Sequence, residues 1–100
     1  MALQRPTERG GWKAPAVGSK ARRKMPRSAF LLPASRKYPF KVYRNGKWEP
    51  SERGLMAARK RAAQQKARGS HGAATAERRA VQKLNTIRRR QGKSPLKIKR

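Results

Sequence analysis

The sequence predicts a mostly α-helical protein with irregular basic arms, in which a short β-hairpin precedes two helices around a small core. Three observations support this fold class. An Asn-Gly pair lies between partly alternating residues, two Ala-rich segments show helical spacing, and both ends combine basic residues with Pro and Gly. We therefore divide the chain into a basic arm (1–27), a hairpin and helix-pair body (28–91) and a basic tail (92–100). The arm and the tail are both expected to be extended.

The arm at residues 1–27 sustains neither a helical nor a strand period, so we expect it to be extended. Trp12 is its only aromatic residue, and we expect this ring to dock on a partner or on the body of the protein. The basic groups of the arm are Arg5, Arg9, Lys13, Lys20, Arg22, Arg23, Lys24 and Arg27.

Residues 40–48 predict a β-hairpin. Asn45-Gly46 supplies two residues that tolerate positive φ, as a tight type I′ turn requires. Alternation then places Phe40 and Val42 on one face, with Lys41 and Tyr43 on the other. Because Tyr38 precedes Pro39, we expect extended backbone at Tyr38.

A first helix is predicted from about Glu52 to Arg68. Ser51 is suited to cap its start, Glu52 favours the positive end of the helix dipole, and Gly69 is suited to end it. The apolar side is thin. It consists of Leu55, Ala58 and Ala62, flanked by Met56 and Ala63.

A second helix is predicted from about Ala74 or Thr75 to Gln91, with Gly92 placed to end it. Its apolar stripe consists of Ala80, Leu84 and Ile87, with Val81 beside it. The basic triplet 88–90 falls in the last turn, where cations interact favourably with the helix dipole and can also reach phosphates.

Charge is the strongest functional signal. The 100 residues include 29 Lys and Arg against four acidic residues, a formal net charge of +25. Self-repulsion opposes compaction, and a polyanionic partner removes this penalty because binding releases the counterions of its phosphates. The composition therefore indicates a protein that binds a polyanion, with nucleic acid favoured.

The sequence offers little for catalysis. Its titratable candidates are four scattered glutamates and a single histidine, His71, in an expected loop, and there is no cysteine. With one His and no Cys an ordinary zinc site cannot form, and no phosphate-cradling glycine motif occurs. We therefore expect a non-enzymatic protein without metal, cofactor or small-molecule substrate.

The segment 1–11 lacks the apolar stretch of a signal peptide, and no window approaches the roughly 20 apolar residues of a membrane span. We expect a protein that is neither secreted nor bound to a membrane. A virion, or the cytoplasm or nucleoid of a host cell, is the expected location.

Residues 28–40 read SAFLLPASRKYPF and precede a basic, Ala-rich helix. This stretch resembles a short module of bacteriophage and large-virus proteins, which has an F-x-x-P pattern followed closely by R-K-Y-P and a helix rich in Ala and Arg. The resemblance covers about residues 28–65, and it implies a viral setting. The residues that carry it are Phe30, Pro33, Arg36, Lys37, Tyr38 and Pro39.

Three functions stay open at this stage. The first is a small basic virion protein that neutralises packaged DNA or bridges it to the shell. The second is a ribosomal protein or RNA-assembly factor, and the third is a cement protein bound to an acidic protein surface. DNA is slightly favoured over RNA, through the resemblance alone. Contacts should be mainly with backbone phosphates and weakly specific for sequence.

The residues expected to bind nucleic acid are the clustered cations of every segment. They are Arg22, Arg23, Lys24, Arg36, Lys37, Arg59, Lys60, Arg61, Arg78, Arg79, Arg88, Arg89, Arg90, Lys97, Lys99 and Arg100.

Overall fold

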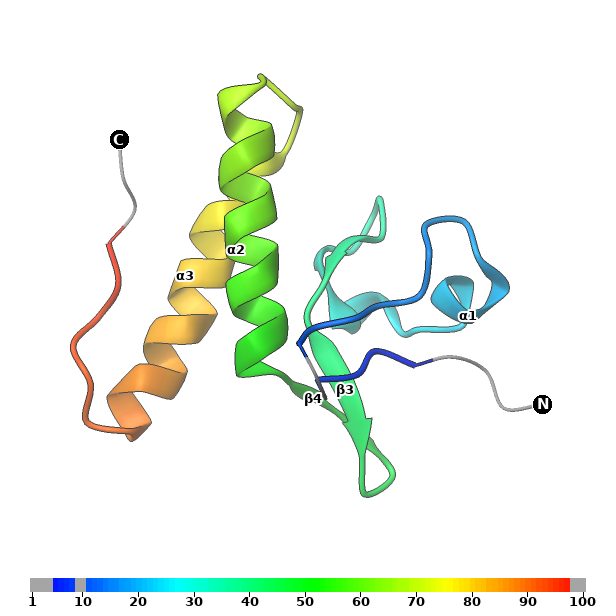
Figure 1. Cartoon of the computed structure of the whole chain (residues 1–100), viewed down its shortest axis with the longest axis horizontal. Helices are drawn as coiled ribbons and strands as arrows, with labels where there is room; N and C mark the ends of the chain where they lie inside the picture. Colours follow the sequence, from blue (N-terminus) through cyan, green and yellow to red (C-terminus); the bar gives the residue numbers. More distant parts are fainter. Residues whose placement is uncertain (1–4, 9–10, 98–100) are drawn as a thin grey trace.

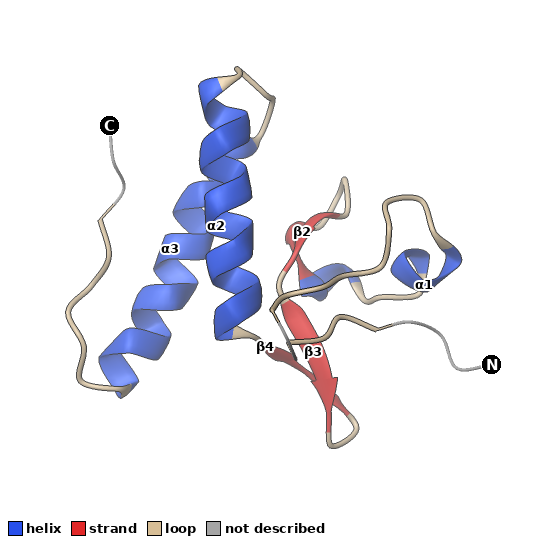
Figure 2. Cartoon of the chain, in the orientation of Figure 1, coloured by secondary structure: helices blue, strands red, loops and turns tan. Residues whose placement is uncertain are grey.

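The computed structural model describes residues 5–8 and 11–97 (Figure 1). In the views of Figures 1 and 2, helix α2 lies between α3 and the strands, and the arm lies on the strand side. The elements in chain order are α1 (Lys20–Arg23), the 3-10 turn η1 (Arg27–Ala29), β1 (Phe30–Leu32), β2 (Lys37–Pro39), β3 (Lys41–Arg44), β4 (Lys47–Pro50), α2 (Glu52–Ala67) and α3 (Ala73–Arg90). The predicted fold class, a short hairpin followed by two packed helices, is confirmed.

The predicted hairpin is formed by the antiparallel strands β3 and β4. Asn45 and Gly46 have φ of 50° and 77°, as the type I′ turn requires. Val42 is buried whereas Tyr43 is exposed, so the two faces are as expected. Tyr43 pairs with Trp48 across the strands, and their rings meet edge-on with centroids 5.5 Å apart.

A second hairpin, β1 with β2, was not predicted. Phe30 pairs with Pro39, and the turn at residues 33–36 places Arg36 at a φ of 54°. Tyr38 has a φ of 63°, so the prediction of extended backbone there is wrong. The left-handed conformation costs about 1–2 kcal/mol. It is offset by burial of the Tyr38 ring in the core and by its hydroxyl, which donates to Gln65 Oε1.

The two long helices begin and end close to their predicted limits. Ser51 caps α2, since its Oγ accepts a hydrogen bond from the Gly54 amide at 3.0 Å. Gly72 precedes α3 with a φ of 80°. Most of the predicted apolar positions are buried, namely Leu55, Ala58 and Ala62 on α2 and Ala80, Val81 and Leu84 on α3. Ile87 is only partly buried, and Met56, expected beside the α2 face, is exposed. Of the helices in the described ranges, none has the length and apolar character to cross a membrane.

The core is small and divided into two clusters. The main cluster joins the helix faces to Leu31, Tyr38 and Phe40 of the strand region, and a smaller one consists of Met25, Ala29 and Phe30. Alanines form much of the contact between α2 and α3, and each buries little apolar area. Apolar packing is therefore a limited source of stability in this fold, and polar contacts have to add to it.

The arm is less extended than expected. Ser19 caps the one-turn helix α1, because its Oγ accepts from the Arg22 amide at 3.2 Å. Trp12 docks on the body at Gly54, where a Cβ atom would lie 2.8 Å from the indole ring. The glycine in α2 thus provides the space for the tryptophan.

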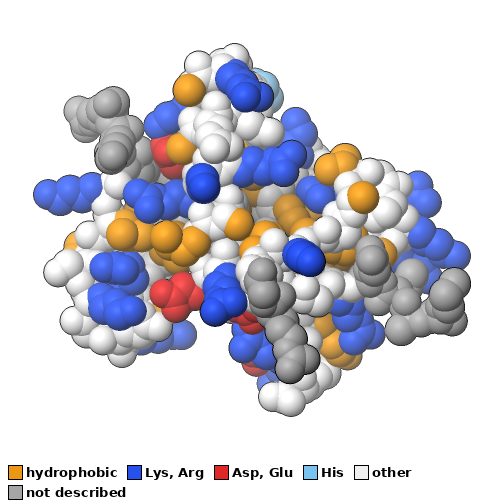
Figure 3. All heavy atoms as spheres, in the orientation of Figure 1, with side chains coloured by type: hydrophobic (Ala, Val, Ile, Leu, Met, Phe, Trp, Pro, Cys, Tyr) orange, Lys and Arg blue, Asp and Glu red, His pale blue; other side chains and the backbone are white. Residues whose placement is uncertain are grey.

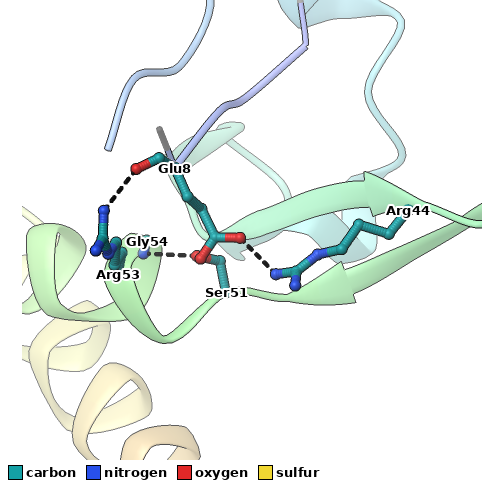
Figure 4. A network of polar contacts seen from close by, with 5 residues as sticks. All are labelled: Glu8, Arg44, Ser51, Arg53 and Gly54. Atoms are coloured by element: carbon teal, nitrogen blue, oxygen red, sulfur yellow. Dashed lines mark hydrogen bonds and ion pairs between the residues drawn. The ribbon is translucent and has the colours of Figure 1, made fainter. Parts of the chain in front are cut away.

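Glu8 fastens the arm to the hairpin and to the start of α2 (Figure 4). One carboxylate oxygen pairs with Arg44, and the other accepts a hydrogen bond from Ser51 Oγ at 2.7 Å. The Glu8 carbonyl accepts from Arg53 at 2.8 Å. A single residue therefore connects the arm to the hairpin and to the start of α2, which lie 36 to 45 residues further along the chain.

The tail turns back along α3 after Gly92 (Figure 1). Asn85 bonds to both backbone groups of Leu96, accepting from its amide at 2.7 Å and donating to its carbonyl at 3.2 Å. Leu96 also packs against the main core cluster. The described part of the tail is consequently attached to the body rather than projecting from it.

Candidate nucleic-acid interface

A hollow of about 690 Å³ lies between the arm, the β1–β2 turn and one face of α2. Residues 14–17, 35–39 and 57–65 supply most of its walls. We call it the basic cleft, because its lining includes the cations Arg22, Arg36, Lys37, Lys60 and Arg61 and no Asp or Glu. All five cations belong to the set that the sequence predicted, and the fold brings them together from three segments.

Arg22 and Arg36 hold the wall of the cleft that the arm and the turn form. Arg22 donates to the carbonyls of Pro15 and Arg36, both at 3.2 Å. Arg36 donates in return to the carbonyls of Arg23 and Met25, at 3.0 and 2.9 Å. Each guanidinium has five N–H donors, and these bonds use the minority of them. Both residues can therefore support the fold and still bind an anion.

Helix α2 supplies the opposite wall. Lys60, Arg61, Gln64 and Gln65 line the cleft. Lys60 and Gln64 are four residues apart, as are Arg61 and Gln65, so the four side chains lie along one side of the helix. Lys60, Arg61 and Gln64 are exposed. This wall presents two cations and two carboxamides to whatever enters the cleft.

Like charges face one another across the cleft. Burial lowers the pKa of the Arg22 guanidinium, and the positive charge of Arg61 lowers it further. Arginine nevertheless stays protonated at neutral pH. Burial raises the pKa of the Tyr38 hydroxyl, while Arg61 acts in the opposite direction. The cleft is therefore a cationic site in which an anion would relieve repulsion.

The cleft also has apolar walls. Trp12 and Tyr38 line it together with Val17, whose side chain is 79% exposed. Tyr38 is almost fully buried, whereas Trp12 keeps part of its ring accessible. Trp12 is thus the aromatic side chain that a ligand in the cleft can reach.

Several predicted cations instead connect parts of the fold. Arg79 donates to the Leu31 carbonyl at 2.7 Å, Arg59 to that of Lys97 at 3.3 Å, and Arg88 to that of Ser94 at 2.6 Å. The others described are exposed and lie outside the cleft: Arg23, Lys24, Arg78, Arg89, Arg90 and Lys97. Lys99 and Arg100 lie outside the described residues.

These outer cations are not part of the lining of the basic cleft. On the face drawn in Figure 3, Lys and Arg side chains are scattered over most of the surface rather than gathered in one patch. Among the described residues, Glu8 and Glu77 form ion pairs with Arg44 and Lys66. Glu52 also accepts a hydrogen bond from Gln91 Nε2 at 3.2 Å. Three of the four acidic residues are thus engaged within the protein, and most of the positive charge faces solvent.

Sequence reasoning missed Trp12, Gln64 and Gln65 as parts of the site. For the glutamines a signal was present, because they follow Lys60 and Arg61 at helical spacing on the polar side of the predicted helix. For Trp12 no local signal existed, since its position depends on a contact with Gly54, which is 42 residues further along the chain (54 − 12).

Among the residues that the structure describes, no group of three His, Cys, Asp or Glu side chains lies close enough together to hold a metal ion.

No protein-family model, curated protein or solved structure matches the chain. What the site does must therefore be inferred from its own residues.

Proposed function

We propose that this protein is a non-enzymatic structural protein that binds nucleic acid by neutralising backbone phosphates. The observation that carries the proposal is the convergence of Arg22, Arg36, Lys37, Lys60 and Arg61 on one cleft without an acidic residue in its lining. The net charge of +25, spread over every segment, adds contacts around this site. Each phosphate contact releases counterions, so affinity grows with the number of cations that reach the backbone.

We further propose a virion-associated role, in which the protein neutralises packaged DNA or bridges it to the shell. The support is the resemblance of residues 28–65 to a viral module. Residues that carry this resemblance have structural roles here, since Phe30 and Tyr38 are buried and Arg36 binds two carbonyls. A shared pattern at such positions favours a shared small fold, and the fold in turn creates the cleft.

A salt titration tests the proposal. The affinity of the protein for unrelated DNA duplexes and for matched RNA duplexes is measured between about 50 and 200 mM salt. We expect a steep fall of log affinity with log salt and similar values for unrelated sequences. Replacing Arg89 and Arg90 by Gln should reduce the slope by about two units if both contact the backbone.

Other outcomes favour the alternatives. A clear preference for RNA would favour the ribosomal or RNA-assembly role. A shallow slope, together with binding to an acidic protein that survives nuclease treatment, would contradict the proposal and favour the cement protein.

A further inference from the structure

We propose that the basic cleft receives an unpaired segment of nucleic acid, with phosphates held between its two cationic walls and a base placed beside Trp12. The inference rests on the proposed function and goes beyond it. Charge alone predicts binding to any phosphate backbone, whereas the cleft selects single-stranded over double-stranded nucleic acid.

Size and shape are the first argument. The hollow of about 690 Å³ lies within the range of about 300–1,000 Å³ that is typical of sites for small organic ligands. A nucleotide unit is such a ligand when its base is unstacked. A duplex keeps its bases between two backbones, so it can touch only the rim of the cleft.

The placement of the charges is the second argument. Lys60 and Arg61 extend from α2, Arg36 from the β1–β2 turn and Lys37 from the start of β2, so cations line the cleft from two sides. Their mutual repulsion is relieved by an anion between them. A sugar-phosphate chain that passes through the cleft meets both sets of cations.

The uncharged lining is the third argument. Single-strand binding sites combine a basic groove with aromatic side chains against which bases stack. Trp12 offers a partly accessible indole, Val17 offers exposed apolar surface, and Gln64 offers an exposed carboxamide that can hydrogen-bond a base edge. A site for phosphate alone would need none of these three side chains.

The fluorescence of Trp12 tests the proposal. The chain has two tryptophans, so Trp48→Phe leaves Trp12 as the only reporter. This variant is titrated with a single-stranded DNA oligonucleotide and with the matched duplex at equal salt. We expect single-stranded DNA to quench the fluorescence and the duplex to leave it nearly unchanged. In the reciprocal Trp12→Phe variant, where Trp48 reports, the strand-dependent quenching should be absent.

Paired charge variants separate the cleft from general charge. Lys60→Gln with Arg61→Gln removes two exposed cations from the cleft, and Arg89→Gln with Arg90→Gln removes two exposed cations from the end of α3. We expect the cleft pair to weaken single-strand binding about tenfold more than the control pair, while both pairs weaken duplex binding alike. Circular dichroism of the two double variants and of the unaltered protein checks that the fold is retained.

The outcomes distinguish the two proposals. Equal quenching by duplex and single strand, or equal losses from the two charge pairs, would overturn the cleft proposal and leave phosphate neutralisation in place. Failure to bind either form of nucleic acid at low salt would overturn both.

Discussion

The α2/α3 pair and the region formed by the arm and the β1–β2 turn both carry arginines, but the two regions depend on them to different extents. In the helix pair, Ala58, Ala62, Ala80 and Leu84 are buried between elements. Arg89 and Arg90 of α3 face solvent, whereas other helix arginines, such as Arg59, Arg79 and Arg88, each donate one hydrogen bond to a carbonyl of another segment. In the arm and turn region, Arg22 and Arg36 instead donate to four backbone carbonyls and fix the course of the chain.

The difference shows how a chain with few acidic residues can still accommodate many cations. Only four glutamates are available to 29 Lys and Arg residues, so most arginines cannot find a carboxylate. Backbone carbonyl oxygens accept the arginine hydrogen bonds instead of carboxylates. Arg36 donates to the Met25 carbonyl, and Arg79 donates to the Leu31 carbonyl. A hydrogen bond to a carbonyl satisfies a guanidinium donor without requiring a counter-charge.

The largest loss of stability is expected from a substitution in the core of the helix pair. Leu84 is 1% exposed within the main core cluster, so Leu84→Ala should lower the free energy of unfolding by about 3 kcal/mol. Urea denaturation followed by circular dichroism measures this loss. The exposed neighbour Gln82 provides the control, and Gln82→Ala should change stability by less than about 0.5 kcal/mol. A loss below about 1 kcal/mol for Leu84→Ala would contradict a core centred on the helix pair.

A second substitution tests the arginine network. Arg36→Lys keeps the charge but cannot reproduce the planar guanidinium that reaches the carbonyls of Arg23 and Met25. We expect a loss of about 2 kcal/mol in the free energy of unfolding. Arg23→Lys is the matched control, because Arg23 is exposed and close in space, and it should be nearly neutral. Equal effects of the two changes would show that Arg36 acts only through its charge.

The same comparison explains what the sequence could predict. Helices α2 and α3 and the β3–β4 hairpin depend on local signals: apolar spacing, the Ser51 cap and the Asn45-Gly46 turn. Each signal lies within a few residues of the structure that it specifies. These elements were therefore predicted with limits correct to one or two residues.

The β1–β2 hairpin and the cleft depend on contacts between distant residues. Arg36 and Tyr38 adopt positive φ, which their residue types do not favour, because side-chain contacts with the arm and with Gln65 stabilise this geometry. Basic residues could be selected from composition, but not the subset that meets in one place. That subset is determined by the turn at Arg36 and by the docking of the arm.

The docking of the arm can be tested at Gly54. Alanine usually stabilises a helix relative to glycine, yet here a Cβ would lie 2.8 Å from the Trp12 ring and 3.0 Å from the Phe40 carbonyl. We expect Gly54→Ala to cost about 1–2 kcal/mol in the free energy of unfolding. In a Trp12→Ala background the cost should fall by about half, since only the carbonyl contact remains. An unchanged cost would show that Trp12 does not press on this position.

The smallest expected loss of stability concerns the Glu8 carboxylate, which fastens the arm to the body. Glu8→Gln removes the ion pair with Arg44, which is half exposed, but keeps an oxygen that can accept from Ser51. We expect a loss of about 0.5 kcal/mol at low salt that fades near 1 M salt, where the Debye length is about 3 Å. Glu49→Gln changes the net charge equally at an exposed residue that forms no ion pair within the described part of the chain, so it corrects for general repulsion.

The loss of stability from Arg36→Lys should persist at high salt, because hydrogen bonds to carbonyls are not screened as exposed ion pairs are. If salt removed both losses equally, carbonyl bonding would not be what stabilises the arm and turn region.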